Sequence, residues 1–148
     1  MDIASQSINN EIMIKELRFK ADIENYTKVR NYCREVGKLI LKDNNRVFEY
    51  LLCIDEIFIN SIIHAYRKNN GNIDVKFILN EKYLITKIRD YGVGIPKTYT
   101  KKIIFTDDDI LSESGRGLYI VNSLADKLEI KNCEDIGTEV SIYFERVR

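Results

Sequence analysis

Apolar and polar positions follow two different spacings along the chain, which predict helices in some segments and strands in others. Apolar residues at helical spacing predict helices over residues 24–41, 45–66 and 117–127. Alternating or short apolar runs, separated by turn residues, predict strands over residues 14–20, 73–79, 83–89, 128–132 and 138–145. The order of these elements predicts an α+β fold, a two-layer sandwich whose mostly antiparallel, mixed sheet carries three helices on one face.

The length and charge of the chain narrow the classes of protein to which it can belong. Its 148 residues fit one domain over residues 1–148 with a core of its own, and we expect the polar residues 1–10 to be frayed. Lys and Arg number 23, Asp and Glu number 23, and the formal net charge is zero. This balance argues against a protein whose main partner is bulk nucleic acid or an acidic membrane.

Cysteine spacing and the absence of long apolar runs predict a cytoplasmic location. Cys33, Cys53 and Cys133 are far apart and form no CxxC pair, so we expect neither a zinc site nor a disulfide framework. No signal peptide or membrane-spanning helix is expected either.

Two polar residues stand out in the predicted helix 45–66, whose other residues are apolar enough to be buried. Glu56 and Asn60 are four positions apart and therefore face the same side of the helix. Buried charge is costly unless it is paired or used. A carboxylate and a carboxamide together suggest oxygen ligands for Mg²⁺, or a base beside such an ion. From these two residues alone, a polar pair on the rim of a buried helix is an equally good interpretation.

Two glycine motifs follow, and each is weak by itself. Asp90-Tyr91-Gly92-Val93-Gly94-Ile95 ends a predicted strand, where Asp-x-Gly is also ordinary turn chemistry. Gly115-Arg116-Gly117-Leu118 precedes a predicted helix, where the glycines fit a hinge equally well. The second motif is neither a P-loop nor a dinucleotide fingerprint. The specific signal is the order of the three segments along the chain.

This order of Glu-x-x-x-Asn, Asp-x-Gly-x-Gly-Ile and Gly-x-Gly-Leu resembles the ATP-binding (Bergerat) fold shared by gyrase, Hsp90, histidine kinases and MutL. Residues 55–66 and 113–126 are most similar to its small bacterial branch, the anti-sigma factor serine kinases. The resemblance covers nearly the whole chain. It implies that residues 96–114 form an ATP lid.

The resemblance also implies roles for individual residues. Asn60 is expected to hold Mg²⁺ and Glu56 to act as the general base that takes the proton of a serine hydroxyl. Asp90 is expected to accept a hydrogen bond from the adenine amino group. The other positions expected to bind ATP are Gly92, Gly94, Ile95, Ser114, Gly115, Arg116, Gly117, Leu118 and Thr138.

The function that the resemblance implies is that of an ATP-dependent protein serine kinase that also acts as an anti-sigma factor. Its expected partners are a sigma factor and an anti-anti-sigma (STAS-type) protein, with a homodimer as the usual assembly, and neither nucleic acid nor membrane is an expected partner. Some members carry an arginine where this chain has Glu113, which leaves open an ATP-binding regulatory module without efficient kinase activity.

Two other enzyme classes share this ATP-binding fold. A histidine-kinase-like catalytic domain is one alternative, although those proteins usually place an asparagine where this chain has Glu56. A carboxylate base suits a hydroxyl nucleophile better than an imidazole, which need not lose a proton. An ATPase of the gyrase or MutL kind is the other, and it would need a second domain to complete its site.

Overall fold

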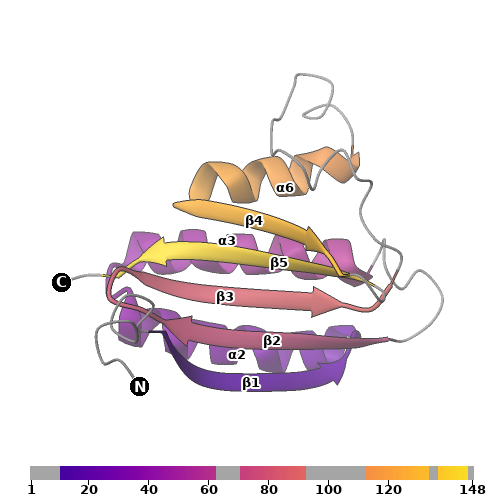
Figure 1. Ribbon diagram of the computed structural model, residues 1–148, viewed down its shortest axis with the longest axis horizontal. Helices are drawn as coiled ribbons and strands as arrows, with labels where there is room; N and C mark the ends of the chain where they lie inside the picture. The colour runs from indigo at the N-terminus through magenta and orange to yellow at the C-terminus, as the bar shows by residue number, and fades with distance from the viewer. Residues whose placement is uncertain (1–10, 63–70, 93–112, 134–136, 147–148) are drawn as a thin grey trace, which may run out of the picture.

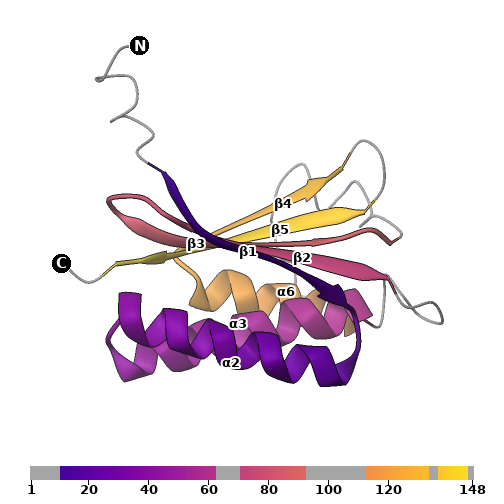
Figure 2. The same ribbon diagram turned by 90° about the horizontal axis from the view of Figure 1, so that it is seen from below.

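The fold is taken from a computed structural model, which describes residues 11–62, 71–92, 113–133 and 137–146. Its elements are β1 (Ile12–Lys20), α2 (Ile23–Ile40), α3 (Asn44–Asn60), β2 (Asn72–Leu79), β3 (Tyr83–Asp90), α6 (Glu113–Leu124), β4 (Lys127–Asn132) and β5 (Thr138–Glu145). The three helices cover one face of the sheet, as the predicted two-layer α+β sandwich requires (Figures 1 and 2). None of the helices in these ranges is long and apolar enough to cross a membrane.

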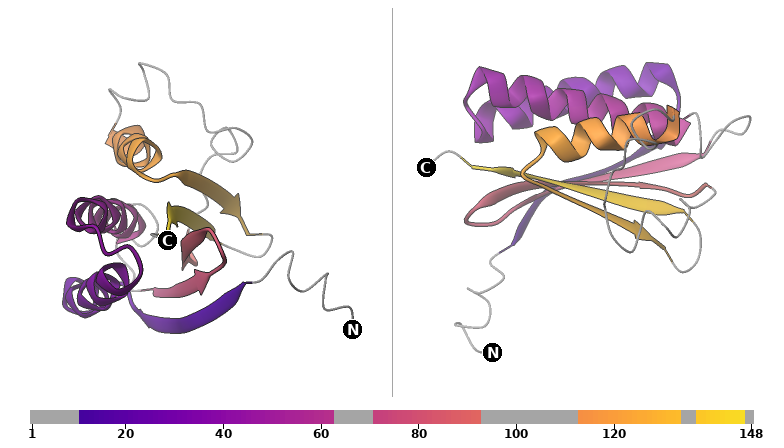
Figure 3. Two further views of the ribbon diagram at one scale, coloured as in Figure 1. Left: turned by 90° about the vertical axis from the view of Figure 1, so that its left-hand side faces the viewer. Right: turned by 90° about the horizontal axis from the view of Figure 1, so that it is seen from above.

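The five described strands form one sheet in the order β1-β2-β3-β5-β4, and each neighbouring pair is antiparallel. Because β3 and β5 are antiparallel neighbours, the end of β3 lies beside the start of β5. Asp90 is therefore the register partner of Thr138. The end of α3 and the start of α6 lie at this same end of the molecule (Figures 1 and 3).

Both long helices begin at an aspartate, as their sequences favour. The Asp22 carboxylate accepts a hydrogen bond from the backbone N–H of Asn25 at 2.8 Å. The Asp43 carboxylate accepts one from the backbone N–H of Asn45 at 2.8 Å and starts α3 in the same way. Such caps satisfy backbone donors that a helix start leaves without partners. They place the start of each helix within one or two residues of its predicted position.

The predicted limits of the third helix are wrong. Residues 117–127 were expected, whereas α6 begins at Glu113 and ends at Leu124. The helix ends early because Ala125 makes its last helical bond, to Val121, and the N–H of Asp126 bonds the backbone oxygen of Tyr143 on β5. Glu113 and Ser114, which the lid prediction included, are helical. Residues 96–112 lie outside the described ranges.

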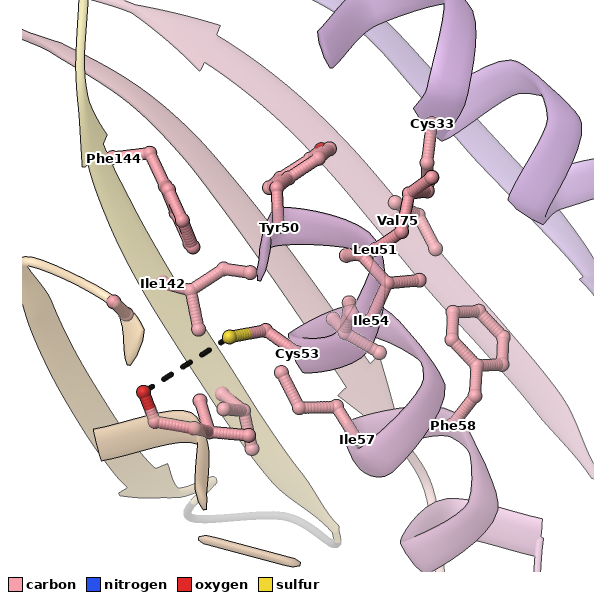
Figure 4. Packing of buried hydrophobic residues seen from close by; sticks show 14 of the residues in the cluster. Cys33, Tyr50, Leu51, Cys53, Ile54, Ile57, Phe58, Val75, Ile142 and Phe144 are labelled. Carbon is pink, nitrogen blue, oxygen red and sulfur yellow. Dashed lines mark hydrogen bonds between the residues drawn. The ribbon is translucent and has the colours of Figure 1, made fainter. Parts of the chain in front are cut away.

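The core lies between α3, at the centre of the helical layer, and the inner face of the sheet. Its largest fully buried side chains are Tyr50, Phe58, Phe77 and Phe144, together with Leu41, Leu84 and five isoleucines. Figure 4 shows one side of α3 packed into this core, with Cys53 close to the backbone oxygen of Val121. Tyr50 is satisfied by a 2.7 Å hydrogen bond to Thr86. This packing fixes the rotation of α3, and therefore the direction in which its polar residues point.

Candidate ATP-binding site

Glu56 and Asn60 lie half-buried on α3, on a side of the helix that faces α6. Their neighbours Ile57 and Phe58 are 2% and 0% exposed, so the core holds this turn in place. On α6, a Cβ atom built on Gly117 would lie 2.8 Å from Oε2 of Glu56 and 3.0 Å from Nδ2 of Asn60. The predicted pair and the second glycine of the Gly-x-Gly motif are therefore in direct proximity.

α3 does not end abruptly at this pair. The N–H of Ser61 still reaches the backbone oxygens of Ile57 and Phe58, and residues 61 and 62 are π-helical. Single π-helical turns within α-helices are frequent at functional sites. The predicted helix extended to Tyr66, and residues 63–66 lie outside the described ranges.

Asp90, the last residue of β3, is buried beside this turn. Its carboxylate accepts hydrogen bonds from the backbone N–H of Gly92 at 3.1 Å and from the hydroxyl of Ser61 at 3.5 Å. Burial raises the pKa of Asp90 above its ordinary value, although hydrogen bonds from Gly92, Thr138 and Ser61 act in the opposite direction. A carboxylate held in this way is a strong hydrogen-bond acceptor for a buried donor.

Ser61 is a site residue that the sequence analysis missed. It is 5% exposed, and its hydroxyl links the end of α3 to Asp90. The signal available in the sequence was its place directly after Asn60, as a further polar residue in an otherwise apolar stretch. This hydrogen bond joins Asp90 to the end of the helix that carries Glu56 and Asn60.

The Gly137-Thr138 pair lies against the backbone of Asp90. Gly137 has a φ of +91°, and a Cβ atom there would collide with the backbone oxygen of Asp90 and approach Cα of Tyr91 to 2.8 Å. Thr138 is 1% exposed, and its hydroxyl donates to Oδ1 of Asn132 at 3.4 Å. The predicted proximity of Thr138 to the Asp90 segment is thus present.

The carboxylate of Asp55 lies close enough to Glu56 for the two charges to interact. Burial and the nearby Glu56 carboxylate raise the pKa of Asp55 to about 6, while the Nε of Arg30, 2.8 Å from Oδ1 of Asp55, favours its charged form. This ion pair is bidentate and close, and it stabilises the charged form of Asp55. Arg30 is therefore directed at Asp55, and Glu56 is left facing Asn60 and Gly117.

Other predicted site residues are placed only in part. The first turn of α6 contains Ser114, Gly115 and Arg116, whose side chains are outside the described set. The described ranges do not include Gly94 and Ile95. Gly92 is buried next to Asp90. Leu118 is 5% exposed and belongs to the core, so a contact with ATP would use its backbone. The roles of all these residues stay predictions.

The arrangement fits Mg²⁺ held jointly with phosphates. Among the described residues, no three His, Cys, Asp or Glu side chains gather closely enough to hold a metal ion. Asn60 and Glu56 nevertheless offer oxygen atoms beside Gly117, in the second turn of α6, where space for a Cβ is missing. Mg²⁺ is commonly bound by one or two such side chains plus substrate phosphates, and helix starts attract anions.

Comparison with known proteins gives a family and several relatives. The family model described as the histidine kinase-like ATPase domain matches residues 19–144. An anti-sigma F factor of Bacillus licheniformis is 31% identical over 91 residues, covering 60% of this chain and 62% of that protein. An anti-sigma F factor of Clostridium acetobutylicum is 22% identical over 126 residues, covering 84% of this chain and 88% of that protein.

A third relative is named for an enzymatic activity. The serine-protein kinase RsbW of Bacillus thuringiensis is 30% identical over 100 residues, which cover 64% of this chain and 62% of that protein. The match thus spans less than two thirds of the Bacillus relatives. The family match, in contrast, covers most of this chain and includes the site residues from Glu56 to Thr138. The chain belongs to the family of histidine kinase-like ATPase domains.

Proposed function

We propose that this chain is an ATP-dependent protein serine kinase that also acts as an anti-sigma factor. Family membership implies that it uses ATP. The names of the relatives, anti-sigma F factor and serine-protein kinase, support the finer assignment. The observation that carries it is the proximity of Gly117 on α6 to both Glu56 and Asn60 on α3, since this brings two of the three motifs into one site.

The protein groups divide the chemistry between them. Asn60 holds Mg²⁺, which supplies charge neutralisation on the phosphates when bound. Glu56 removes the proton from the attacking serine hydroxyl. The serine oxygen forms a bond to the γ-phosphorus, the bond from that phosphorus to the β,γ-bridging oxygen breaks, and ADP leaves. The proton stays on the Glu56 carboxylate until it passes to solvent.

Asp90 supplies selectivity for adenine. Its buried carboxylate accepts a hydrogen bond from the adenine amino group, in addition to those from Gly92 and Ser61. Guanine places an acceptor oxygen at the corresponding position, so two acceptors would face each other. An unmatched buried polar group costs about 1–3 kcal/mol, which is enough to favour ATP over GTP.

The kinase activity is tested with labelled ATP and candidate anti-anti-sigma domains. Acid-stable phosphoserine supports the proposal, whereas acid-labile label would indicate phosphohistidine and overturn the serine assignment. Glu56→Gln should keep ATP affinity and lose phosphoryl transfer, while Glu35→Gln, an exposed change on α2, should retain both. ATP binding without transfer to any domain would instead favour a regulatory ATP-binding module.

The Mg²⁺ ligand has its own test. Asn60→Ala should remove the dependence of ATP affinity on Mg²⁺, measured by calorimetry with and without the ion. A normal Mg²⁺ dependence in this variant would show that Asn60 is not the ligand. Ser123→Ala, a change on the exposed side of α6, serves as the control and should leave that dependence intact.

The proposed partners are a sigma factor, an anti-anti-sigma protein and a second copy of this chain. For the homodimer, the supporting observation is the edge strand β1, where Ile12, Met13 and Ile14 are 65%, 55% and 41% exposed. An apolar edge strand readily pairs with another chain. Sedimentation of an Ile12→Lys, Ile14→Lys double variant should show monomers, and an unchanged mass would exclude this edge.

A further inference from the structure

Tyr91 lies within the Asp90-Tyr91-Gly92 segment, but its side chain belongs to the opposite face of the sheet. The Asp90 carboxylate is buried beside Ser61 at the end of α3, whereas the Tyr91 hydroxyl is among the charged residues of the outer face. There it borders a hollow of about 230 Å³, whose lining also includes Arg18, Asp74 and Arg89. Asp90 and Tyr91 are thus neighbours in the chain, but the Asp90 side chain is on the ATP side of the sheet and the Tyr91 side chain is on the outer face.

The Tyr91 hydroxyl is fixed by two charged groups from different strands. It donates a hydrogen bond to Oδ2 of Asp74 on β2 and accepts one from Nη2 of Arg18 on β1 at 3.0 Å. Arg18 also binds Asp74 through two hydrogen bonds, of 2.6 and 2.9 Å. Hydrogen bonds to charged groups are stronger than those between neutral groups. The bond from Tyr91 to Asp74 completes a network of three residues, Arg18, Asp74 and Tyr91.

The Tyr91 ring is held as well as its hydroxyl. The guanidinium carbons of Arg89 and Arg18 lie 4.6 and 5.5 Å from the ring centroid, within the range of cation–π attraction. Asp74 is the register partner of both arginines, Arg18 on β1 and Arg89 on β3. Three neighbouring strands therefore converge on a single side chain.

Asp74 is well suited to serve as the fixed point of this network. It is 8% exposed, and hydrogen bonds from Arg18 hold its pKa below the ordinary value. The carboxylate therefore stays ionised at neutral pH and keeps accepting from the Tyr91 hydroxyl. In contrast, β3 ends at Asp90, so Tyr91 is beyond the last residue of that strand. Its side chain takes over the anchoring at the point where strand pairing stops.

We propose that Tyr91 is a positioning residue for adenine recognition. By anchoring the backbone directly after Asp90, the Arg18–Asp74–Tyr91 network fixes the Asp90 carboxylate and the Gly92 N–H that binds it. Tyr91 does not touch the nucleotide, because its side chain is on the outer face. The inference rests on the proposed function, in which Asp90 accepts the adenine amino hydrogen.

The test compares Tyr91→Phe with Tyr143→Phe. Tyr143 is also on the outer face, bonds a carboxylate through its hydroxyl (Glu129) and has a cation, Nζ of Lys127, 4.8 Å from its ring centroid. It lies toward the far end of β5 from Thr138. Each change removes one hydroxyl and keeps the ring, so the two variants lose equivalent groups at different distances from the site.

In calorimetry with Mg²⁺, Tyr91→Phe should weaken ATP binding about three- to tenfold, the range expected for one hydrogen bond. GTP affinity should stay unchanged, so the ATP-to-GTP preference narrows. A general structural defect would weaken both nucleotides together. Tyr143→Phe should match the wild type, and Tyr91→Phe should add little in an Asp74→Asn background.

Wild-type ATP affinity and selectivity in Tyr91→Phe would overturn the positioning role, provided that Asp90→Asn weakens ATP binding. If Asp90→Asn leaves ATP affinity unchanged, the adenine contact itself is wrong, and the role of Tyr91 falls with it. Equal losses for ATP and GTP, or equal losses in Tyr91→Phe and Tyr143→Phe, would also contradict the proposal. Thermal unfolding of each variant identifies any that are misfolded.

Discussion

Gly117 on α6 leaves the space that the Glu56 carboxylate on α3 occupies. A Cβ at position 117 would be 2.8 Å from Oε2 of Glu56, closer than real Cβ contacts come. The space at position 117 is therefore limited by the packing of two helices at the site, and not by the backbone conformation of the glycine. This explains why a residue with low helix propensity lies inside α6.

Gly117→Ala should consequently separate stability from activity. The atom that must move is the end of a flexible side chain, and alanine favours a helix by up to about 1 kcal/mol over glycine. We expect the free energy of unfolding to stay equal or rise, while phosphoryl transfer falls at least about tenfold because Glu56 is displaced. Urea denaturation and a phosphotransfer assay measure the two effects.

Gly37→Ala is the matched control for this prediction. Gly37 is also within a helix, but a Cβ there would meet Cδ2 of the core residue Tyr50 at 3.2 Å. Its substitution should alter stability and leave phosphoryl transfer per folded molecule unchanged. Full activity in Gly117→Ala would show that Glu56 does not need its observed position.

Gly137→Ala should lower the free energy of unfolding, whereas Gly117→Ala should not. The φ of +91° is unfavourable for alanine, and the obstructing atoms are backbone atoms of Asp90 and Tyr91, which cannot rotate away. We expect the free energy of unfolding to fall by about 2 kcal/mol or more, since strain and overpacking add. Chemical denaturation checks this, and a loss below about 0.5 kcal/mol would contradict the packing of Gly137 on β3.

Local signals in the sequence were enough for most of the fold and for the centre of the site. Apolar spacing predicted every described element, and a four-residue spacing placed Glu56 and Asn60 together. The start of α6 was predicted four residues too late, because Gly115 and Gly117 argue against helix in the sequence, and its end depends on a hydrogen bond from Asp126 to Tyr143 on β5.

Contacts between residues far apart in the sequence could not be predicted from local spacing. The Arg18–Asp74–Tyr91 network depends on the register of β1 against β2, which places three distant residues together. No spacing within the chain encodes that register. Ser61 was missed for a related reason, since its role depends on where the end of α3 meets β3.

Arg46 should be a major contributor to stability away from the site. Its guanidinium donates to Glu49 at 2.7 Å, to Asp126 at 2.7 Å and to the backbone oxygen of Leu124 at 3.0 Å, and it lies 4.5 Å from the Phe144 ring centroid. It thus joins α3 to the end of α6 and to β5. Arg46→Met, which keeps the packing of the stem, should lower the free energy of unfolding by about 1–3 kcal/mol.

The control for Arg46 is Arg34→Met, which removes one exposed hydrogen bond of 3.2 Å to Asn31 within α2. Surface changes of this kind usually stay within about 0.5 kcal/mol. Denaturant titration of both variants makes the comparison. Similar losses in the two would show that the Arg46 contacts add nothing beyond an ordinary surface arginine.

The buried, charged carboxylate of Asp90 should make the ATP-free protein less stable at neutral pH, although the same carboxylate is proposed to bind adenine. Burial raises its pKa in the folded state, so the stability that its protonated form contributes is complete below the unfolded pKa and is lost as pH rises through the folded pKa. Asp90→Asn removes the buried charge. Its amide oxygen still accepts from Gly92, and its amide nitrogen can donate to Ser61.

Asp90→Asn should therefore melt at a higher temperature than the wild type at pH 7, and the difference should shrink as pH falls through the pKa of Asp90. ATP affinity should change in the other direction. It is reduced in the variant at all pH values, and in the wild type it declines on acidification as Asp90 takes up a proton and stops accepting from adenine. Thermal melts and calorimetry across the acidic to neutral range test both. A variant that is less stable than the wild type at pH 7 would mean that the hydrogen bonds from Gly92, Ser61 and Thr138 outweigh the burial of the charge.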